Sequence, residues 1–163
     1  MVNCYKSKDA LEEAINNLEN GEWVLVVIEP PTKALEDVVC DPGIKLFSGT
    51  HSRNISILTN MLEWKESLIT PDHDCIIIQA NLMKQKVNIA GIYYNPEVTL
   101  ADFRTRVKNL HEQLVRVKGQ RIFVTGDVNC RSPIWSNEEV DRKGTILMNA
   151  CCLLYTSPSP RDS

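Results

Sequence analysis

Apolar and polar positions along the chain fall into blocks that favour helices and strands in turn. Ser7 can cap a helix that Asn20-Gly21 would end, because apolar residues recur between them at spacings of three and four. These apolar residues are Leu11, Ile15 and Leu18. The next block, residues 23–28, is an unbroken apolar run of strand length. Such a run is typical of a strand that is covered on both faces.

Three further apolar segments have strand length and follow one another without an intervening helix, which favours an antiparallel or mixed sheet. They are residues 55–59, 75–79 and 87–93. The stretch 32–50, between the first buried strand and this group, has the composition of a loop with a turn at Asp41-Pro42-Gly43.

The amphipathic pattern that begins at Thr99 predicts a helix that ends near Gly119. Asp102, three residues after Thr99, gives a weaker form of the capping box. The apolar stripe of this helix is Leu100, Phe103, Val107, Leu110, Leu114 and Val117. Residues 121–125 then predict another buried strand, and a last helix is predicted over 141–151.

Length, composition and net charge limit the classes of protein to which the chain can belong. With 163 residues, 43% of them apolar, the chain has room for one domain with a hydrophobic core. A net charge of −3 excludes nucleic-acid binding through bulk positive charge, so phosphate contacts would need local Lys/Arg clusters or a bound metal. The six cysteines lack CxxC spacing, which argues against zinc and favours a reducing, intracellular compartment. No stretch approaches the ~20 apolar residues of a membrane span, so we expect no membrane partner.

The last stretch, 152–163, differs from the rest. Its alternation of Ser and Pro is incompatible with continuing the preceding helix, and it resembles a sequencing-library adapter translated as coding sequence. We therefore expect a native region of 1–151 and a non-native tail of 152–163. A natural flexible tail is the alternative.

Two apolar strands end in acids. Glu29 follows the run 23–28, and Asp127 follows 121–125 with only Gly126 between, which lets the backbone turn sharply. Together with the amide oxygens of Asn3 and Asn129, these carboxylates form a hard-oxygen set suited to Mg²⁺. Each signal alone has a simpler explanation, a solvated strand-end acid or an Asx-type turn.

The motifs that contain these residues follow one another in an order that is found in a known protein family. Five motifs occur in series, and they are Val2-Asn3 with Ser7-Lys8, Ile28-Glu29-Pro30, Tyr93-Tyr94-Asn95-Pro96, the block 126–135 and Asp141-Arg142-Lys143-Gly144. The series resembles the endonuclease/exonuclease/phosphatase superfamily, and more narrowly the endonuclease domain of jockey-like non-LTR retrotransposons. The resemblance covers roughly residues 2–151, and the block Gly-Asp-Val-Asn-Cys-Arg-Ser-Pro-Ile-Trp at 126–135 is its most specific part.

The resemblance implies an α/β (α+β) fold, a four-layer β-sandwich flanked by helices of the DNase I-like type. It implies that Glu29 binds Mg²⁺, or Mn²⁺, with help from Asn3. Asp127 would orient or deprotonate the attacking water, Asn129 would donate to the phosphate, and Tyr93 would supply a hydroxyl to a phosphate oxygen. Tyr94 is the competing choice for that hydroxyl. Tyr93 as a core aromatic and Asn3 as a strand-end backbone partner stay open.

The resemblance also implies a substrate and a partner domain, and it shows which residues of the family this sequence lacks. The substrate would be the DNA phosphodiester backbone, nicked in the nucleus by a parent protein that carries a reverse transcriptase domain. The family has a later Asp and an Asp-His pair, and this sequence has no histidine after His111. We therefore expect the C-terminal part of the domain to be missing and this chain to be inactive. The alternatives are a binding or structural fragment without activity, and a phosphoinositide-type phosphatase of the same superfamily.

Overall fold

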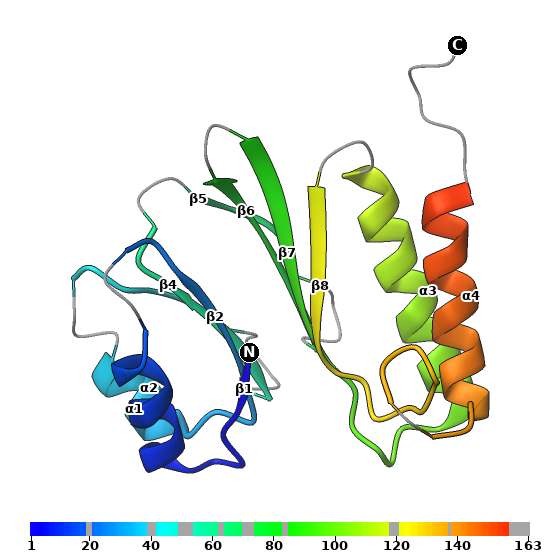
Figure 1. Cartoon of the computed structure of the whole chain (residues 1–163), viewed down its shortest axis with the longest axis horizontal. Coiled ribbons are helices and arrows are strands. Elements are labelled where there is room, and N and C mark those ends of the chain that lie inside the picture. Colours follow the sequence, from blue (N-terminus) through cyan, green and yellow to red (C-terminus); the bar gives the residue numbers. More distant parts are fainter. Residues whose placement is uncertain are drawn as a thin grey trace. The chain divides into compact units, whose positions relative to one another are not determined.

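The computed structural model describes residues 1–18, 21–38, 42–48, 54–61, 64–69, 74–82, 85–117, 121–136 and 138–156 (Figure 1). Its contacts divide the chain into two compact units. The first unit is Met1–Tyr93 with Phe123–Asp127, and the second is Tyr94–Ile122 with Val128–Ser163. The strands are β1 (Val2–Asn3), β2 (Val24–Ile28), β3 (Lys45–Ser48), β4 (Ile55–Thr59), β5 (Trp64–Ile69), β6 (Cys75–Leu82), β7 (Gln85–Tyr93) and β8 (Arg121–Asp127). The helices are α1 (Lys8–Asn16), α2 (Thr32–Val38), α3 (Leu100–Arg116) and α4 (Arg142–Thr156).

Two four-stranded sheets build the first unit. One has the order β1-β2-β4-β3 and the other the order β5-β6-β7-β8. β1 runs parallel to β2, whereas β2 with β4, β3 with β4, and the successive pairs from β5 to β7 are antiparallel. The α/β class predicted from the sequence is therefore confirmed. The three strands predicted to follow one another in an antiparallel or mixed sheet are divided, with β4 in one sheet and β6 and β7 in the other.

β2 is buried on both of its faces, as its unbroken apolar run predicted. Val26 and Ile28 join a core cluster that also contains residues of the second sheet, among them Ile76 and Ile78. The alternate residues Leu25 and Val27 face a second cluster that includes residues of α1 and α2. Because successive side chains of a strand point to opposite faces, one short strand contributes to both cores.

α1 begins where the sequence predicted and ends earlier. The Oγ of Ser7 accepts a hydrogen bond from the backbone N–H of Ala10 at 3.3 Å, which caps the helix. The helix ends at Asn16 with Asn17 as its C-cap, before the predicted stop at Asn20-Gly21.

The prediction that 32–50 is a loop was wrong. Helix α2 and strand β3 lie within it, and β5 was also missed. Pro31 leads directly into α2 and its carbonyl accepts the N–H of Leu35 at 3.1 Å. Ala34 and Leu35 are the buried residues of this seven-residue helix. A helix this short shows too little periodicity to be read from the sequence, and tertiary burial stabilises it instead.

The second unit contains α3 and α4, which pack on each other (Figure 1). α3 has the predicted N-cap, because the Thr99 hydroxyl oxygen accepts the Asp102 N–H at 3.2 Å. The Asp102 carboxylate accepts the Thr99 hydroxyl at 2.7 Å, whereas in a capping box it would accept the Thr99 backbone N–H. The predicted apolar stripe supplies Phe103 and Val107 to a cluster with Tyr94 and Leu147. Gly119, the predicted stop, lies outside the described residues, and α3 ends at Arg116 with Val117 as its C-cap.

Two predictions near the C-terminal end were wrong. β8 is not a buried strand, because Phe123 is 58% and Val124 is 47% exposed. β8 is the last strand in the order of its sheet, and edge strands expose more side-chain surface than central ones. α4 continues past Cys151 to Thr156, because residues 152–156 contain no proline and the first proline comes at Pro158. Residues 157–163 lie outside the described part, and the non-native origin of 152–163 stays a prediction.

No helix in the described ranges is long and apolar enough to cross a membrane.

Replacement of Thr99 by Ala removes the cap of α3 and is expected to lower the free energy of unfolding by about 1 kcal/mol. Thr105→Ala is the matched control within the same helix. The Thr105 hydroxyl only donates back to the Ala101 carbonyl at 3.2 Å, and Ala is the better helix former, so no loss is expected. Urea unfolding followed by circular dichroism measures both variants. Equal losses would contradict the capping role.

Candidate functional site

Asn3 lies beside the end of β2. The parallel pairing of β1 with β2 places Asn3 in register with Ile28, one residue before Glu29. The side-chain oxygen of Asn3 accepts the backbone N–H of Tyr5 at 3.1 Å. Asn3 is therefore a strand-end backbone partner, as one interpretation of the sequence had it. A carbonyl oxygen has two lone pairs, so this bond leaves room for a metal ligand.

Glu29 has a left-handed backbone conformation, with φ at +47°. This conformation costs free energy in a residue with a side chain. Two backbone hydrogen bonds hold it, one from the Glu29 N–H to the Asn54 carbonyl at 2.7 Å and one from the Lys6 N–H to the Glu29 carbonyl at 2.7 Å. The carboxylate is thus aimed by a backbone that is fixed on both sides.

Tyr93, the last residue of β7, connects the second sheet to Glu29. Its hydroxyl donates to Glu29 Oε1 at 3.0 Å, while its ring is only 5% exposed and belongs to the core between the sheets. Burial, which is the largest cause, raises the pKa of Tyr93 to about 12 together with the hydrogen bond to Glu29, the charge of Glu29 and the charge of Asp127. Both acids therefore act on the same hydroxyl.

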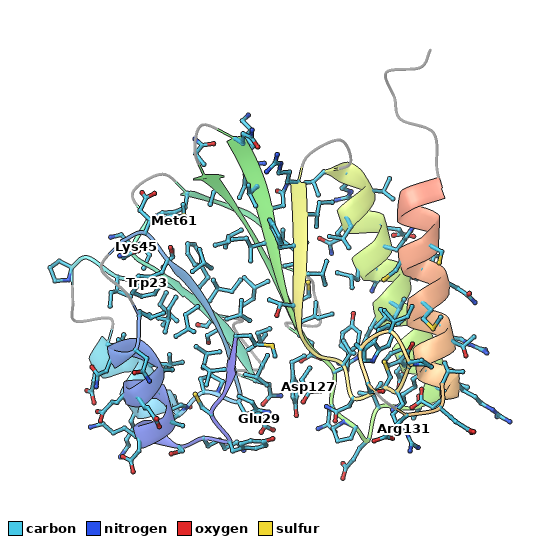
Figure 2. The ribbon with its side chains drawn as sticks, viewed as in Figure 1. Trp23, Glu29, Lys45, Met61, Asp127 and Arg131 are labelled. Atoms are coloured by element: carbon cyan, nitrogen blue, oxygen red, sulfur yellow. The ribbon has the colours of Figure 1, made fainter. Side chains whose placement is uncertain are left out.

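Asp127 is the last residue of β8, and Gly126 before it allows the strand to pass close to the backbone of β7. The φ of Gly126 is +151°, and a Cβ at this position would overlap the carbonyl oxygen of Ile92. Only glycine fits so close to the backbone of β7. Figure 2 shows Glu29 and Asp127 at the ends of their strands.

Asn129 belongs to the second unit, and its backbone is also left-handed, with φ at +47°. Its side-chain N–H group donates to the carbonyl of Tyr94 at 3.0 Å. The loop after it is held by Trp135, whose indole N–H donates to the Cys130 carbonyl at 2.9 Å.

Arg131 secures the other end of this loop within the second unit. Its side chain pairs with Glu138 at 3.0 Å and reaches Asp141 at 3.9 Å, and Figure 2 labels its position. The Asp141 carboxylate accepts the Gly144 N–H at 2.6 Å at the start of α4. A Cβ on Gly144 would overlap the Arg131 carbonyl, which accounts for the glycine in Asp141-Arg142-Lys143-Gly144.

Four of the five predicted site residues, Asn3, Glu29, Tyr93 and Asp127, lie in the first unit. A hydrogen bond joins Tyr93 to Glu29, the charge of Asp127 acts on Tyr93, and Asn3 lies in register with Ile28, the residue before Glu29. Asn129 lies in the second unit. The Tyr93 hydroxyl reaches an acid. Tyr94 is 2% exposed and packs edge-on against Phe103, with 5.4 Å between the ring centroids.

The donor chemistry fits Mg²⁺. Glu29 and Asp127 offer carboxylate oxygens and Asn3 an amide oxygen, and Mg²⁺ takes one or two carboxylates and keeps several waters. Across the part of the chain that the structure describes, no three His, Cys, Asp or Glu side chains gather as a metal-binding group. The residues present suit a hydrated ion that a substrate completes, rather than a closed protein cage.

Sequence reasoning missed the residues that hold Glu29. Lys6 and Asn54 act through backbone groups, which every residue type carries, so no signal in the sequence identifies them. Pro30 does not reveal the left-handed bend at Glu29 either, because a proline favours an extended conformation in the residue before it.

Gly126→Ala is expected to lower the free energy of unfolding by roughly 3 kcal/mol, because the new methyl group must displace the backbone of β7. Gly21→Ala is the matched control, since a Cβ there meets nothing within 4 Å. Its effect should stay within about 0.5 kcal/mol. Urea midpoints of the two variants measure the difference, and a tolerated Gly126→Ala would refute the close approach.

The raised pKa of Tyr93 makes its contribution to stability dependent on pH. The neutral hydroxyl is favoured in the folded protein, so this contribution is complete below the unfolded pKa of about 10 and is lost as pH rises through about 12. Titration of the phenolate absorbance should show a late component among the four tyrosines. Tyr93→Phe should remove that component, and Glu29→Gln should move it to lower pH. Titration curves that are the same in all three proteins would contradict the contact.

Solved structures of known proteins share this fold. The endonuclease domain of TRAS1, a telomere-specific non-LTR retrotransposon, superposes with a TM-score of 0.69 at 15% identity, covering 94% of this chain and 68% of that domain. D. rerio TDP2 complexed with single strand DNA product gives 0.54 at 16%, covering 84% of this chain and 59% of TDP2. A mutant beta toxin from Staphylococcus aureus with bound magnesium ions gives 0.56 at 15%, covering 90% and 62%.

No family model and no curated protein matches the chain. The structural similarity extends over most of this chain at low identity, and it therefore identifies the fold. The chain has the DNase I-like fold that these structures share, which is the fold that the order of its motifs predicted.

Proposed function

We propose that this chain is part of a magnesium-dependent DNA-nicking endonuclease of the non-LTR retrotransposon type. The observation that carries the proposal is the pair of carboxylates around Tyr93. Glu29 accepts the Tyr93 hydroxyl at 3.0 Å, and the charge of Asp127 acts on the same group. The two acids lie at the ends of strands of different sheets. Glu29, the proposed metal ligand, and Asp127, the proposed base, therefore come from separate strands and both act on Tyr93.

Glu29 and Asn3 are the residues that would hold Mg²⁺, and Mn²⁺ has the same ligand preference. When bound, the ion would supply Lewis-acid polarisation of the phosphodiester and stabilisation of the leaving oxygen, and the product would be a nicked strand with a free 3′-hydroxyl. Tyr93 donates to Glu29 and so restrains the carboxylate. Its single hydroxyl hydrogen is used in that bond, so we assign Tyr93 a positioning role rather than a direct phosphate contact.

Asp127 orients the attacking water and takes its proton, which requires a carboxylate that is ionised near neutral pH and within hydrogen-bond reach. Gly126 supports this role because it lets β8 end close to the backbone of β7. Asn129, which lies in the second unit, keeps the role that the resemblance implies, which is donation to the phosphate as negative charge develops.

The neighbours support the substrate and cofactor parts of the proposal. TRAS1 is described as a retrotransposon endonuclease domain, a TDP2 structure contains single-stranded DNA product, and a beta toxin structure contains magnesium ions. In a parent protein of the retrotransposon type, a reverse transcriptase domain would follow and the reaction would take place in the nucleus.

Hydrolysis by these 163 residues alone is expected to be slow or absent. The sequence has no histidine after His111, so the Asp-His pair that the resemblance implies has no counterpart. Groups of a catalytic unit act together, and loss of one can remove most of the rate. Metal binding depends on fewer groups and is the better first measurement.

Calorimetric titration with Mg²⁺ tests the metal site. The wild-type chain should bind Mg²⁺, and Glu29→Gln should weaken that binding by about tenfold or more, since a charged ligand is lost. Glu13→Gln, which removes an exposed carboxylate of α1, is the charge-matched control and should bind as the wild type does. Absence of Mg²⁺ binding in the wild type would defeat the enzymatic proposal and leave a binding or structural fragment.

Nicking of supercoiled plasmid tests the chemistry. Any Mg²⁺-dependent nicking by the chain should fall by roughly a hundredfold in Asp127→Asn, the scale of general-base catalysis. The same variant should retain Mg²⁺ binding through Glu29. Nicking that is equally fast in Asp127→Asn would assign the base to another residue.

A further inference from the structure

The segment that connects β1 to α1 is fixed at every backbone N–H group. Residues 4–7 all donate hydrogen bonds within the first unit. The acceptors are, in order, Ile28 O at 2.9 Å, Asn3 Oδ1 at 3.1 Å, Glu29 O at 2.7 Å and Cys4 O at 2.7 Å. The segment is therefore attached to the end of β2 and to both residues that we assign to the metal.

Two consecutive residues of this segment are left-handed. Tyr5 has φ at +46° and Lys6 at +62°. A side chain disfavours this conformation because its Cβ crowds the backbone, whereas Gly adopts it freely and Asn tolerates it. Local backbone preference would select Gly or Asn at position 5, and the sequence has a tyrosine.

Burial does not offset this cost. The Tyr5 side chain is 77% exposed, whereas Tyr93 and Tyr94 are 5% and 2% exposed. Neither the backbone nor core packing accounts for the aromatic ring. A strained residue that the fold does not require points to a role in binding.

The surroundings of Tyr5 indicate the chemistry of the ligand. Lys6 carries an exposed ammonium group, and its own N–H is bonded to the Glu29 carbonyl. An exposed aromatic residue followed directly by an exposed cationic residue suits a nucleotide, because a base stacks on the ring and a neighbouring phosphate binds the charge. Lys8, the next cation, pairs with Glu12 at 3.2 Å, so we assign the phosphate contact to Lys6.

We propose that Tyr5 is a stacking platform for an unpaired base of the nucleic acid substrate, with Lys6 contacting the adjacent phosphate. This proposal rests on the proposed function and adds to it a residue that selects substrates with unstacked or single-stranded nucleotides near Glu29. The site lies on the first unit alone.

The test relies on a substitution of Tyr5 that should stabilise the fold and at the same time weaken binding of the oligonucleotide. The probe is a fluorescein-labelled single-stranded oligonucleotide that carries one 2-aminopurine, whose fluorescence is quenched by stacking. Tyr5→Asn relieves the left-handed strain and should raise the urea midpoint. The same variant should weaken oligonucleotide binding by about tenfold and remove most of the quenching. Tyr5→Phe retains an aromatic face and should keep both the affinity and the quenching.

Phe123→Ala is the control, because it removes another exposed aromatic ring of the first unit and should leave binding unchanged. If Tyr5→Asn binds the oligonucleotide as tightly as the wild type, the stacking proposal fails and the nuclease proposal stands. If Tyr5→Asn unfolds more readily than the wild type, the tyrosine serves the fold and the proposal also fails. If the wild type binds no oligonucleotide, both proposals fail.

Discussion

The bend at Glu29 is the constraint on which the candidate site depends. The chain leaves β2 with a left-handed residue, and two backbone hydrogen bonds hold that residue in place. One partner, Lys6, follows β1, and the other, Asn54, immediately precedes β4. Both neighbouring strands of β2 therefore fix the bend, and the pairing of the sheet decides where the carboxylate points.

Tyr93 extends this constraint to the second sheet. Its ring belongs to the core that the two sheets share, and its hydroxyl reaches Glu29. A residue anchored by a packed core has little freedom, so its hydrogen bond restrains the carboxylate in a way that a surface side chain would not. The position of the acid follows from hydrophobic packing as well as from strand pairing.

Among the described residues, the left-handed backbone conformations occur at positions to which we assign a role in binding or catalysis. The residues other than glycine with positive φ are Tyr5, Lys6, Glu29 and Asn129. Asn129 tolerates this conformation, and the other three are poor choices for it. Sequences depart from local preference mainly at functional sites, and this distribution agrees with that rule.

The sequence predicted the helices and strands in which many positions share the same apolar or polar preference. An unbroken apolar run identified β2, a mostly apolar segment identified β4, and a three-four spacing after Thr99 identified α3, because many positions repeat the same preference. α2 has only two buried residues, and β5 carries no alternation that distinguishes it from a loop. The apolar run of β8 suggested burial, yet exposure depends on the neighbours of a strand, which its own sequence does not contain.

The acids of the candidate site were predictable because they follow strands and stand in a recognisable order. Their environment was not predictable. The bond of Tyr93 to Glu29 joins residues 64 positions apart, and the backbone partners of Glu29 leave no trace in residue type. Tyr5 could be noticed only once its exposure and its φ were known.

The central claim is that Mg²⁺ binds at Glu29, next to the hydroxyl of Tyr93. Fluorine NMR of a fluorotyrosine-labelled chain tests it directly, with Tyr93→Phe assigning the resonance. Addition of Mg²⁺ near neutral pH should shift the Tyr93 resonance, because the ion changes the charge that its hydroxyl faces, and Glu29→Gln should abolish the shift. A Tyr93 resonance that stays in place while Mg²⁺ binds elsewhere on the chain would contradict the account.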